Sequence, residues 1–226
     1  MCFSANASFA ASTVTGVVGI IAITKTKTTS QLLFAIIPLL FSVQQLSEGI
    51  LWLSLKQESL APWRSIFLYV FLVFATIIWP VIIPLTTRLL EKDRLRKRIL
   101  SVLCVLGATA SATILWIMIC FPLQVTSAGH HLHYQFDLPK SVKGLVWIFT
   151  SVYLVATIAA PFVSSIKGMN WLGLVFLGAY ALTLATFPSS VVSVWCYFAA
   201  TLSIIVLWIL MEIRKYKKNI GEIVFQ

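Results

Sequence analysis

The chain has 226 residues, of which 59% are hydrophobic and only 11% are charged. A mean hydropathy of +0.95 excludes a soluble globular protein, because a water-exposed surface needs more polar side chains than this composition supplies. The net charge of +10 does not indicate a nucleic-acid partner, because the basic residues cluster between and after apolar segments, as they do in membrane proteins. We therefore predict an all-α integral membrane protein whose first partner is the lipid bilayer.

Seven apolar segments are long enough to cross a bilayer as helices. Most connections between them are short and no soluble module separates them, so residues 1–226 are predicted to form a single seven-helix transmembrane domain. The predicted spans are Ala5–Ile23, Leu32–Leu53, Ser65–Leu85, Ile99–Phe121, Leu145–Ser164, Trp171–Phe187 and Val191–Met211.

The second span contains an acid, Glu48, at a depth where charge is costly. A carboxylate at the centre of a membrane helix costs about 2.5–3.5 kcal/mol on insertion scales and often marks function. Gln44 and Gln45 precede it by four and three residues and Trp52 follows it by four, so all of them share one helical face. This stripe predicts a polar binding surface inside the bundle. Candidate partners in the polar first half of span one are Asn6, Ser8 and Ser12.

Two interpretations of Glu48 follow from its position. In the structural interpretation it is a neutral carboxyl that hydrogen-bonds Gln44, Gln45 or a serine of the first span. In the functional interpretation it is a general base, a metal ligand or a proton-relay group, which water reaches from one side of the membrane. The residues by themselves leave both interpretations open.

The distribution of basic residues predicts the orientation of the chain. All but four of the 17 lysines and arginines fall in the connections after spans one, three and five or behind span seven. The positive-inside rule then places the amino terminus outside and the carboxyl terminus in the cytoplasm. Within the cytoplasmic connections, residues 91–98 are predicted to form a solvated helix extension. The four basic residues on the external side are Lys56, Arg64, Lys140 and Lys143.

Most of the chain's potential metal ligands are predicted on that external side, together with Glu48. The one long connection, from Pro122 to about Gly144, contains all three histidines, and Trp195 and Cys196 lie near the external end of span seven. Thiolate, imidazole and carboxylate are the ligand types that zinc uses, and copper also accepts imidazole and thiolate. The predicted ligands for zinc or copper are Cys2, Cys196, His130, His131 and His133.

Two hypotheses that need no metal also account for these cysteines and histidines. The external face is oxidising, so a structural disulfide among Cys2, Cys120 and Cys196 is one of them. In the second hypothesis, the cysteines are small buried hydrophobes and the histidines are ordinary loop residues. The sequence leaves the metal site and both of these hypotheses open.

Three short motifs resemble an uncharacterised family of bacterial polytopic membrane proteins. Members of that family begin Met-Cys-Phe-Ser-Ala and carry Gln-Gln-x-x-Glu-Gly in their second span. The resemblance implies a multi-pass protein of the bacterial inner membrane, with Cys2, Gln44, Gln45, Glu48 and Cys196 as pattern positions, and it implies no activity. The matching motifs in this chain are Met1–Ala5, Gln44–Gly49 and Trp195–Phe198.

These observations predict a polar, externally opening site around Glu48, with Gln44, Gln45, Trp52, Asn6 and Trp195 as its binding residues. The leading hypothesis is metal-assisted hydrolysis or group transfer on a lipid-like substrate, with Glu48 as the general base or a metal ligand. The competing hypothesis is a non-enzymatic carrier or sensor that binds a proton, a cation or a small ligand at Glu48.

Overall fold

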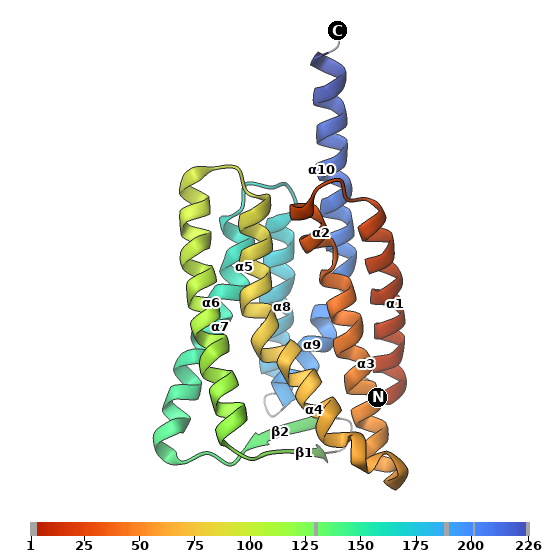
Figure 1. Ribbon diagram of the computed structural model, residues 1–226, viewed down its shortest axis with the longest axis vertical. Coiled ribbons are helices and arrows are strands. Elements are labelled where there is room, and N and C mark those ends of the chain that lie inside the picture. Colours follow the sequence, from red (N-terminus) through yellow and green to blue (C-terminus); the bar gives the residue numbers. More distant parts are fainter. Residues whose placement is uncertain (1–3, 129–130, 188–189, 201, 225–226) are drawn as a thin grey trace.

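The computed structural model describes residues 4–128, 131–187, 190–200 and 202–224, and within these ranges the chain forms an all-α bundle (Figure 1). Seven helical stretches among the described residues are long and apolar enough to cross a membrane, as the sequence predicts. Large apolar side chains such as Ile119 and Trp147 are about three-quarters exposed, which is the expected condition of a lipid-facing surface. The helices are α1 (Ala5–Thr24), α2 (Thr29–Ala35), α3 (Ile37–Lys56), α4 (Arg64–Leu72), α5 (Trp79–Leu90), α6 (Arg94–Cys120), α7 (Lys140–Val163), α8 (Met169–Thr186), α9 (Val191–Ala200) and α10 (Ser203–Val224).

Several spans are built from more than one helical element. The second joins α2 to α3 at Ile36, just before Pro38. The third runs from the 3-10 helix η1 (Glu58–Trp63) through α4 and the π-helix η2 (Val73–Ile78) into α5. Pro80 has no N–H to donate to the preceding turn, and the π-helix ends at Ile78, two residues before it.

Small residues bring the helices close together. Ser12 of α1 and Ser42 of α3 each donate a hydrogen bond to the other's carbonyl, at 2.9 and 2.8 Å. A Cβ atom added at Gly107 of α6 would lie 1.7 Å from the Pro80 carbonyl oxygen, so these two helices touch backbone to backbone. Such contacts are how membrane helices pack when lipid removes the hydrophobic driving force.

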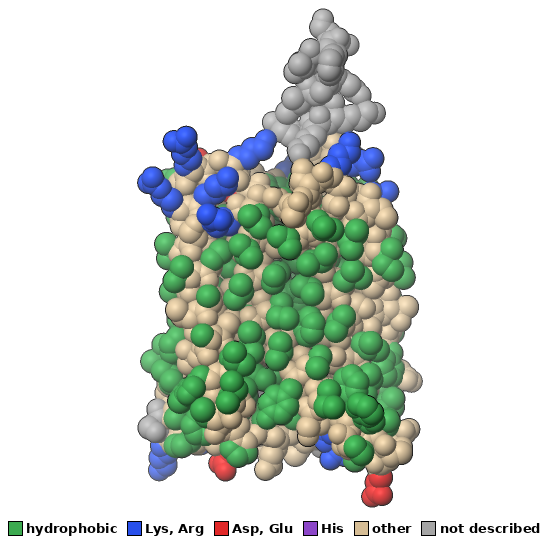
Figure 2. Space-filling view, viewed as in Figure 1, with side chains coloured by type: hydrophobic (Ala, Val, Ile, Leu, Met, Phe, Trp, Pro, Cys, Tyr) green, Lys and Arg blue, Asp and Glu red, His purple; other side chains and the backbone are tan. Residues whose placement is uncertain are grey.

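The two ends of the bundle differ in charge and structure. The basic end comprises the connections at residues 25–28, 91–93 and 164–168, and Figure 2 shows Lys and Arg side chains gathered there beyond a broad hydrophobic band. The hairpin end comprises the α3–α4 connection and an antiparallel hairpin of β1 (Leu123–Ala128) and β2 (His131–Phe136). In Figure 1 the hairpin runs across the lower end of the bundle, below α4 and α9.

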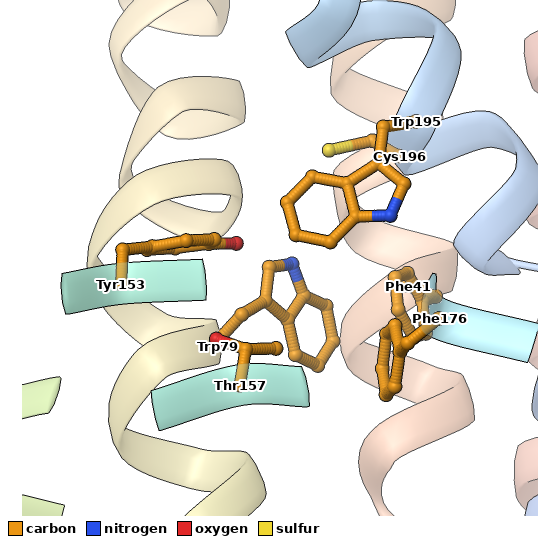
Figure 3. A pocket seen from close by; sticks show the side chains of 7 residues that line it. All are labelled: Phe41, Trp79, Tyr153, Thr157, Phe176, Trp195 and Cys196. Atoms are coloured by element: carbon orange, nitrogen blue, oxygen red, sulfur yellow. The ribbon is translucent and has the colours of Figure 1, made fainter. Parts of the chain in front are cut away.

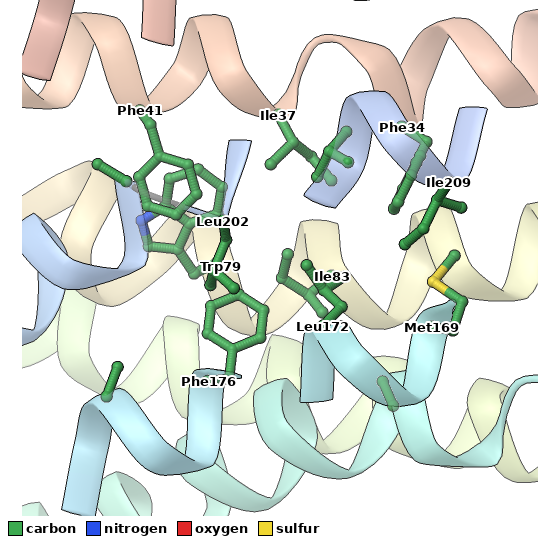
Figure 4. Close-up of a cluster of buried hydrophobic side chains, with 14 of the residues drawn as sticks. Phe34, Ile37, Phe41, Trp79, Ile83, Met169, Leu172, Phe176, Leu202 and Ile209 are labelled. Carbon is green, nitrogen blue, oxygen red and sulfur yellow. The ribbon is translucent and has the colours of Figure 1, made fainter. Parts of the chain in front are cut away.

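Near the basic end a group of large apolar side chains fills the middle of the bundle. Side chains from α2, α3, α5, α8 and α10 point into one space there (Figure 4), and each is at most 1% exposed. We call this group the apolar seal: Phe34, Ile37, Ile83, Met169, Leu172 and Ile209.

The basic end is held together by Glu91. The other residues of the predicted solvated helix extension, 92–98, are exposed or half-buried and run into the start of α6, so Glu91 is the exception to that prediction. Glu91 is 1% exposed and lies between α5 and α6. It accepts hydrogen bonds from the backbone N–H groups of Lys92, Asp93 and Ser165 and from the hydroxyls of Ser164 and Ser165. Burial alone would raise the pKa of Glu91, but these donors, led by Ser165, lower it to about 2. The carboxylate therefore fastens the α5–α6 connection to the α7–α8 connection.

Candidate functional site

Glu48 lies in α3 near the hairpin end of the bundle and is 1% exposed. Spacings of three and four residues place the Phe41, Gln44, Gln45 and Trp52 side chains on the same inner face, and each of them is buried. The predicted stripe therefore faces the protein interior, as the helical period requires.

Polar groups from three different elements surround the Glu48 carboxyl. Within the described residues its hydrogen-bond donor is the Ser193 hydroxyl of α9, which donates to Oε1. The side chains of Gln45 and Tyr134 also lie against the carboxyl. Neither makes a hydrogen bond of ordinary geometry with any described group, although the Gln45 carboxamide and the Tyr134 hydroxyl are fully buried. We call Glu48, Gln45, Ser193 and Tyr134 the oxygen cluster.

Positive charge is missing from the described surroundings of this carboxyl. The ion pairs formed by the described residues join Glu212 to Lys167 and to Lys215, at the other end of the bundle. The groups that act on Glu48 are uncharged hydroxyl, carboxamide and phenol side chains. An isolated buried carboxylate is unfavourable unless a proton or a cation compensates it.

The hairpin closes the site at its end of the bundle. Leu132 is fully buried and packs in the same cluster as Trp52 and Phe71. Tyr134, two residues further on the same face of β2, stacks on Phe71 with ring centroids 5.1 Å apart and an interplanar angle of 18°. His133 points to the other face, where its Nε2 lies 3.4 Å from the Ser190 hydroxyl just before α9. The histidine-containing connection therefore folds over the mouth of the bundle.

On the other side of Glu48, toward the bundle centre, most of the neighbouring side chains are aromatic. Gln44 Oε1 accepts a hydrogen bond of 2.7 Å from Trp79 Nε1. Trp195 makes edge contacts with Tyr153 and Tyr180 at centroid distances of 5.7 and 5.4 Å. A cavity of about 10 Å³ lies among these rings (Figure 3), lined by Phe41, Trp79, Tyr153, Thr157, Phe176, Trp195 and Cys196. It has room for about one water and is mostly apolar, so it is a packing gap rather than a ligand pocket.

The predicted metal ligands do not converge in the described part of the chain. No group of three or more described His, Cys, Asp or Glu side chains is placed to hold a metal ion. The physical reason is strand alternation, which turns Leu132 and Tyr134 toward the cluster around Phe71 and turns His133 to the opposite face of β2, where it meets Ser190. Cys2 and His130 lie outside the described residues, and of His131 only the backbone pairing with Ala128 is described.

The other predicted site residues differ in burial and in their hydrogen-bond partners. Cys196 is buried beside the cavity, whereas Cys120 is exposed, and both are free thiols together with Cys104. Trp52 and Trp195 are buried, but their indole N–H groups have no partner among the described residues. On α1, Ser12 pairs with Ser42 rather than with Glu48, and Asn6 is exposed.

Two residues of the oxygen cluster, Ser193 and Tyr134, are not among the predicted site residues. Ser193 precedes Cys196 by three residues and therefore shares its helical face, which is a signal that the sequence carries. Tyr134 carries no such signal, because its position depends on how a long connection folds back.

The architecture defines a class of multi-pass membrane protein in which a buried carboxyl, Glu48, is covered by a hairpin at one end of the bundle and is separated from the other end by apolar side chains. Residues 1–220 match a family of unknown function, DUF6629, and the chain belongs to this family. Neither the comparison with curated proteins nor the comparison with solved structures gives a match.

Proposed function

We propose that this protein is a membrane sensor or carrier that binds an alkali-metal cation such as sodium at Glu48. The observation that carries the proposal is a buried carboxyl that has no cationic partner among the described residues and is surrounded by uncharged oxygen-bearing side chains. Carboxylate, carbonyl and hydroxyl oxygens are the ligands that hard cations prefer.

The unpartnered groups favour an alkali-metal cation over a proton. A proton would neutralise Glu48 and give it one O–H donor, which can serve only one of the two oxygens beside it, Gln45 Oε1 and the Tyr134 hydroxyl, that lack a partner among the described residues. One cation contacts several oxygens at once and so compensates both the charge and the buried acceptors.

The surroundings support exchange of the cation at the hairpin end. Toward the basic end, the aromatic gap and then the apolar seal separate Glu48 from solvent. The basic residues predict that the hairpin end faces outside and the basic end faces the cytoplasm. We therefore propose that the ion site opens to the external side and, on the resemblance of the motifs to a bacterial family, that the membrane is a bacterial inner membrane.

The competing hypothesis, metal-assisted hydrolysis or transfer on a lipid-like substrate, has less support. The described cysteine and histidine side chains do not converge on Glu48, and the neighbouring gap of about 10 Å³ holds no acyl chain. We therefore favour binding over catalysis.

Thermal unfolding of the purified protein in detergent tests the proposal. Sodium chloride should raise the unfolding midpoint relative to choline chloride at equal ionic strength, because a ligand of the folded state stabilises it. Glu48→Gln should abolish the shift, and Glu58→Gln, which changes an exposed glutamate at the same end, should keep it.

Three outcomes separate the alternatives. A midpoint that rises with acidity but not with sodium in a Glu48-dependent way would assign a proton instead of an alkali-metal cation. Stoichiometric zinc or copper that depends on Glu48 would restore the metal-assisted hypothesis. A midpoint that is insensitive to every ion, or an unchanged sodium shift in Glu48→Gln, would refute the proposal.

A further inference from the structure

One member of the oxygen cluster does not belong to the membrane spans. Tyr134 lies on β2 of the hairpin, and its hydroxyl is buried against Glu48 with no partner of ordinary geometry among the described residues. Burial and the neighbouring Glu48 charge raise the pKa of Tyr134 well above its ordinary value, so the side chain remains a neutral phenol. A neutral phenol oxygen is free to contact a cation without adding a second charge.

The hairpin is docked on the bundle by contacts around that hydroxyl. Leu132 fills the cluster formed with Leu51 and Trp52, and the Tyr134 ring stacks on Phe71 of α4. On the opposite face, His133 meets the hydroxyl of Ser190. Ser190 is three residues before Ser193, whose hydroxyl donates to Glu48, so one end of α9 contacts both the hairpin and the site.

We propose that Tyr134 is a ligand of the bound cation, so that the site is complete only while the hairpin is docked and the cation exchanges when the hairpin lifts. This inference rests on the proposed cation site at Glu48. It adds a residue that determines the affinity for the cation, and it assigns the exchange step to the two paired strands β1 and β2.

The chemistry explains why the ligand would come from a movable element. Three of the four oxygen groups are on α3 and α9, which are packed in the bundle, and they cannot open the site without disturbing the spans. The hairpin meets the bundle through Leu132, Tyr134 and the His133–Ser190 contact, and its Leu123, Val125 and Phe136 side chains pack against the same cluster. Lifting the hairpin separates these side chains from the bundle and removes one ligand at the same time, while α3 and α9 stay packed.

The first test removes only the Tyr134 hydroxyl. Tyr134→Phe keeps the ring that stacks on Phe71, so the unfolding midpoint in choline chloride should remain unchanged. A sodium titration of that midpoint should show an affinity about tenfold weaker, the effect of losing roughly 1.4 kcal/mol of ligand interaction. Tyr69→Phe, at an exposed tyrosine of α4, should keep the wild-type affinity.

The second test locks the hairpin. His133→Cys and Ser190→Cys introduce thiols where two side chains already touch, in a background with the four native cysteines replaced by alanine. Oxidation should slow the exchange of radioactive sodium by about tenfold or more if the hairpin gates the site, and reduction of the same sample should restore it.

The results distinguish this inference from the function on which it rests. If sodium binding is lost in Glu48→Gln but is unchanged in Tyr134→Phe, the cation site stands and the role of Tyr134 is refuted. Equal exchange in the oxidised and reduced proteins would refute the gating step. Wild-type protein that does not bind sodium would refute the proposed function itself.

Discussion

Two glutamates, Glu48 and Glu91, are each 1% exposed, yet their carboxyl groups differ in how many hydrogen bonds they accept. Glu91 at the basic end accepts five hydrogen bonds, three of them from backbone N–H groups. Glu48 at the hairpin end accepts one from Ser193 and has neighbours whose polar atoms remain unpartnered among the described residues. A buried acid whose hydrogen bonds are satisfied serves the fold, whereas one left incomplete points to a ligand.

The largest expected effect comes from replacing Glu91, the glutamate whose hydrogen bonds are satisfied. Glu91→Gln places an NH2 group where N–H and hydroxyl donors converge, so we expect a loss of about 2–3 kcal/mol in unfolding free energy. The measurement is the midpoint of thermal or denaturant unfolding, with Glu58→Gln as the exposed control. A loss no greater than that of the control would show that the Glu91 contacts contribute little to stability.

The pH dependence of stability sharpens the comparison. The pKa of Glu91 is lowered from 4.5 to about 2 in the folded protein, so its stabilising contribution is complete above about pH 4.5 and is lost as the pH falls toward 2. The stability difference between wild type and Glu91→Gln should therefore shrink progressively below pH 4.5. Unfolding midpoints of both proteins between pH 6 and pH 3 test this, and a constant difference would contradict it.

The smallest expected effect comes from replacing Glu48, the glutamate that accepts one hydrogen bond from the described residues. In choline chloride without alkali-metal ions, Glu48→Gln should change the unfolding free energy by less than about 1 kcal/mol or stabilise the protein, because it removes an uncompensated buried carboxyl. The same unfolding measurement applies. A loss as large as that of Glu91→Gln would mean that Glu48 is a structural acid and would erase the contrast between the two ends.

Much of the architecture is predictable because it depends on local properties of the chain. Span two is recognisable from its apolar length, and the inward face of Gln44, Gln45 and Glu48 follows from helical spacing. Residues 91–98, in contrast, look like a charged solvated segment, and the burial of Glu91 depends on Ser165 from a connection more than 70 residues away. Composition carries no information about that pairing.

The candidate site likewise has one residue that the sequence predicts and partners that only the tertiary structure brings to it. Glu48 stands out in the sequence because an acid in an apolar helix is costly, whatever surrounds it. Its Ser193 partner is 145 residues away, and Tyr134 reaches it because a hairpin folds across the bundle. Of the expected histidine ligands, His133 is turned to the other face by the strand register that buries Leu132, and His130 lies outside the described residues.

The sequence by itself determined the membrane class, the seven spans and the acid on an inner helical face, because each depends on hydrophobicity and periodicity along the chain. Only the tertiary structure decided which groups meet that acid and that the hairpin covers it. It also decided that Glu91 joins two connections by hydrogen bonds and is not a surface charge. These are contacts between distant segments, and their free energy depends on packing and on donor geometry that no single segment contains.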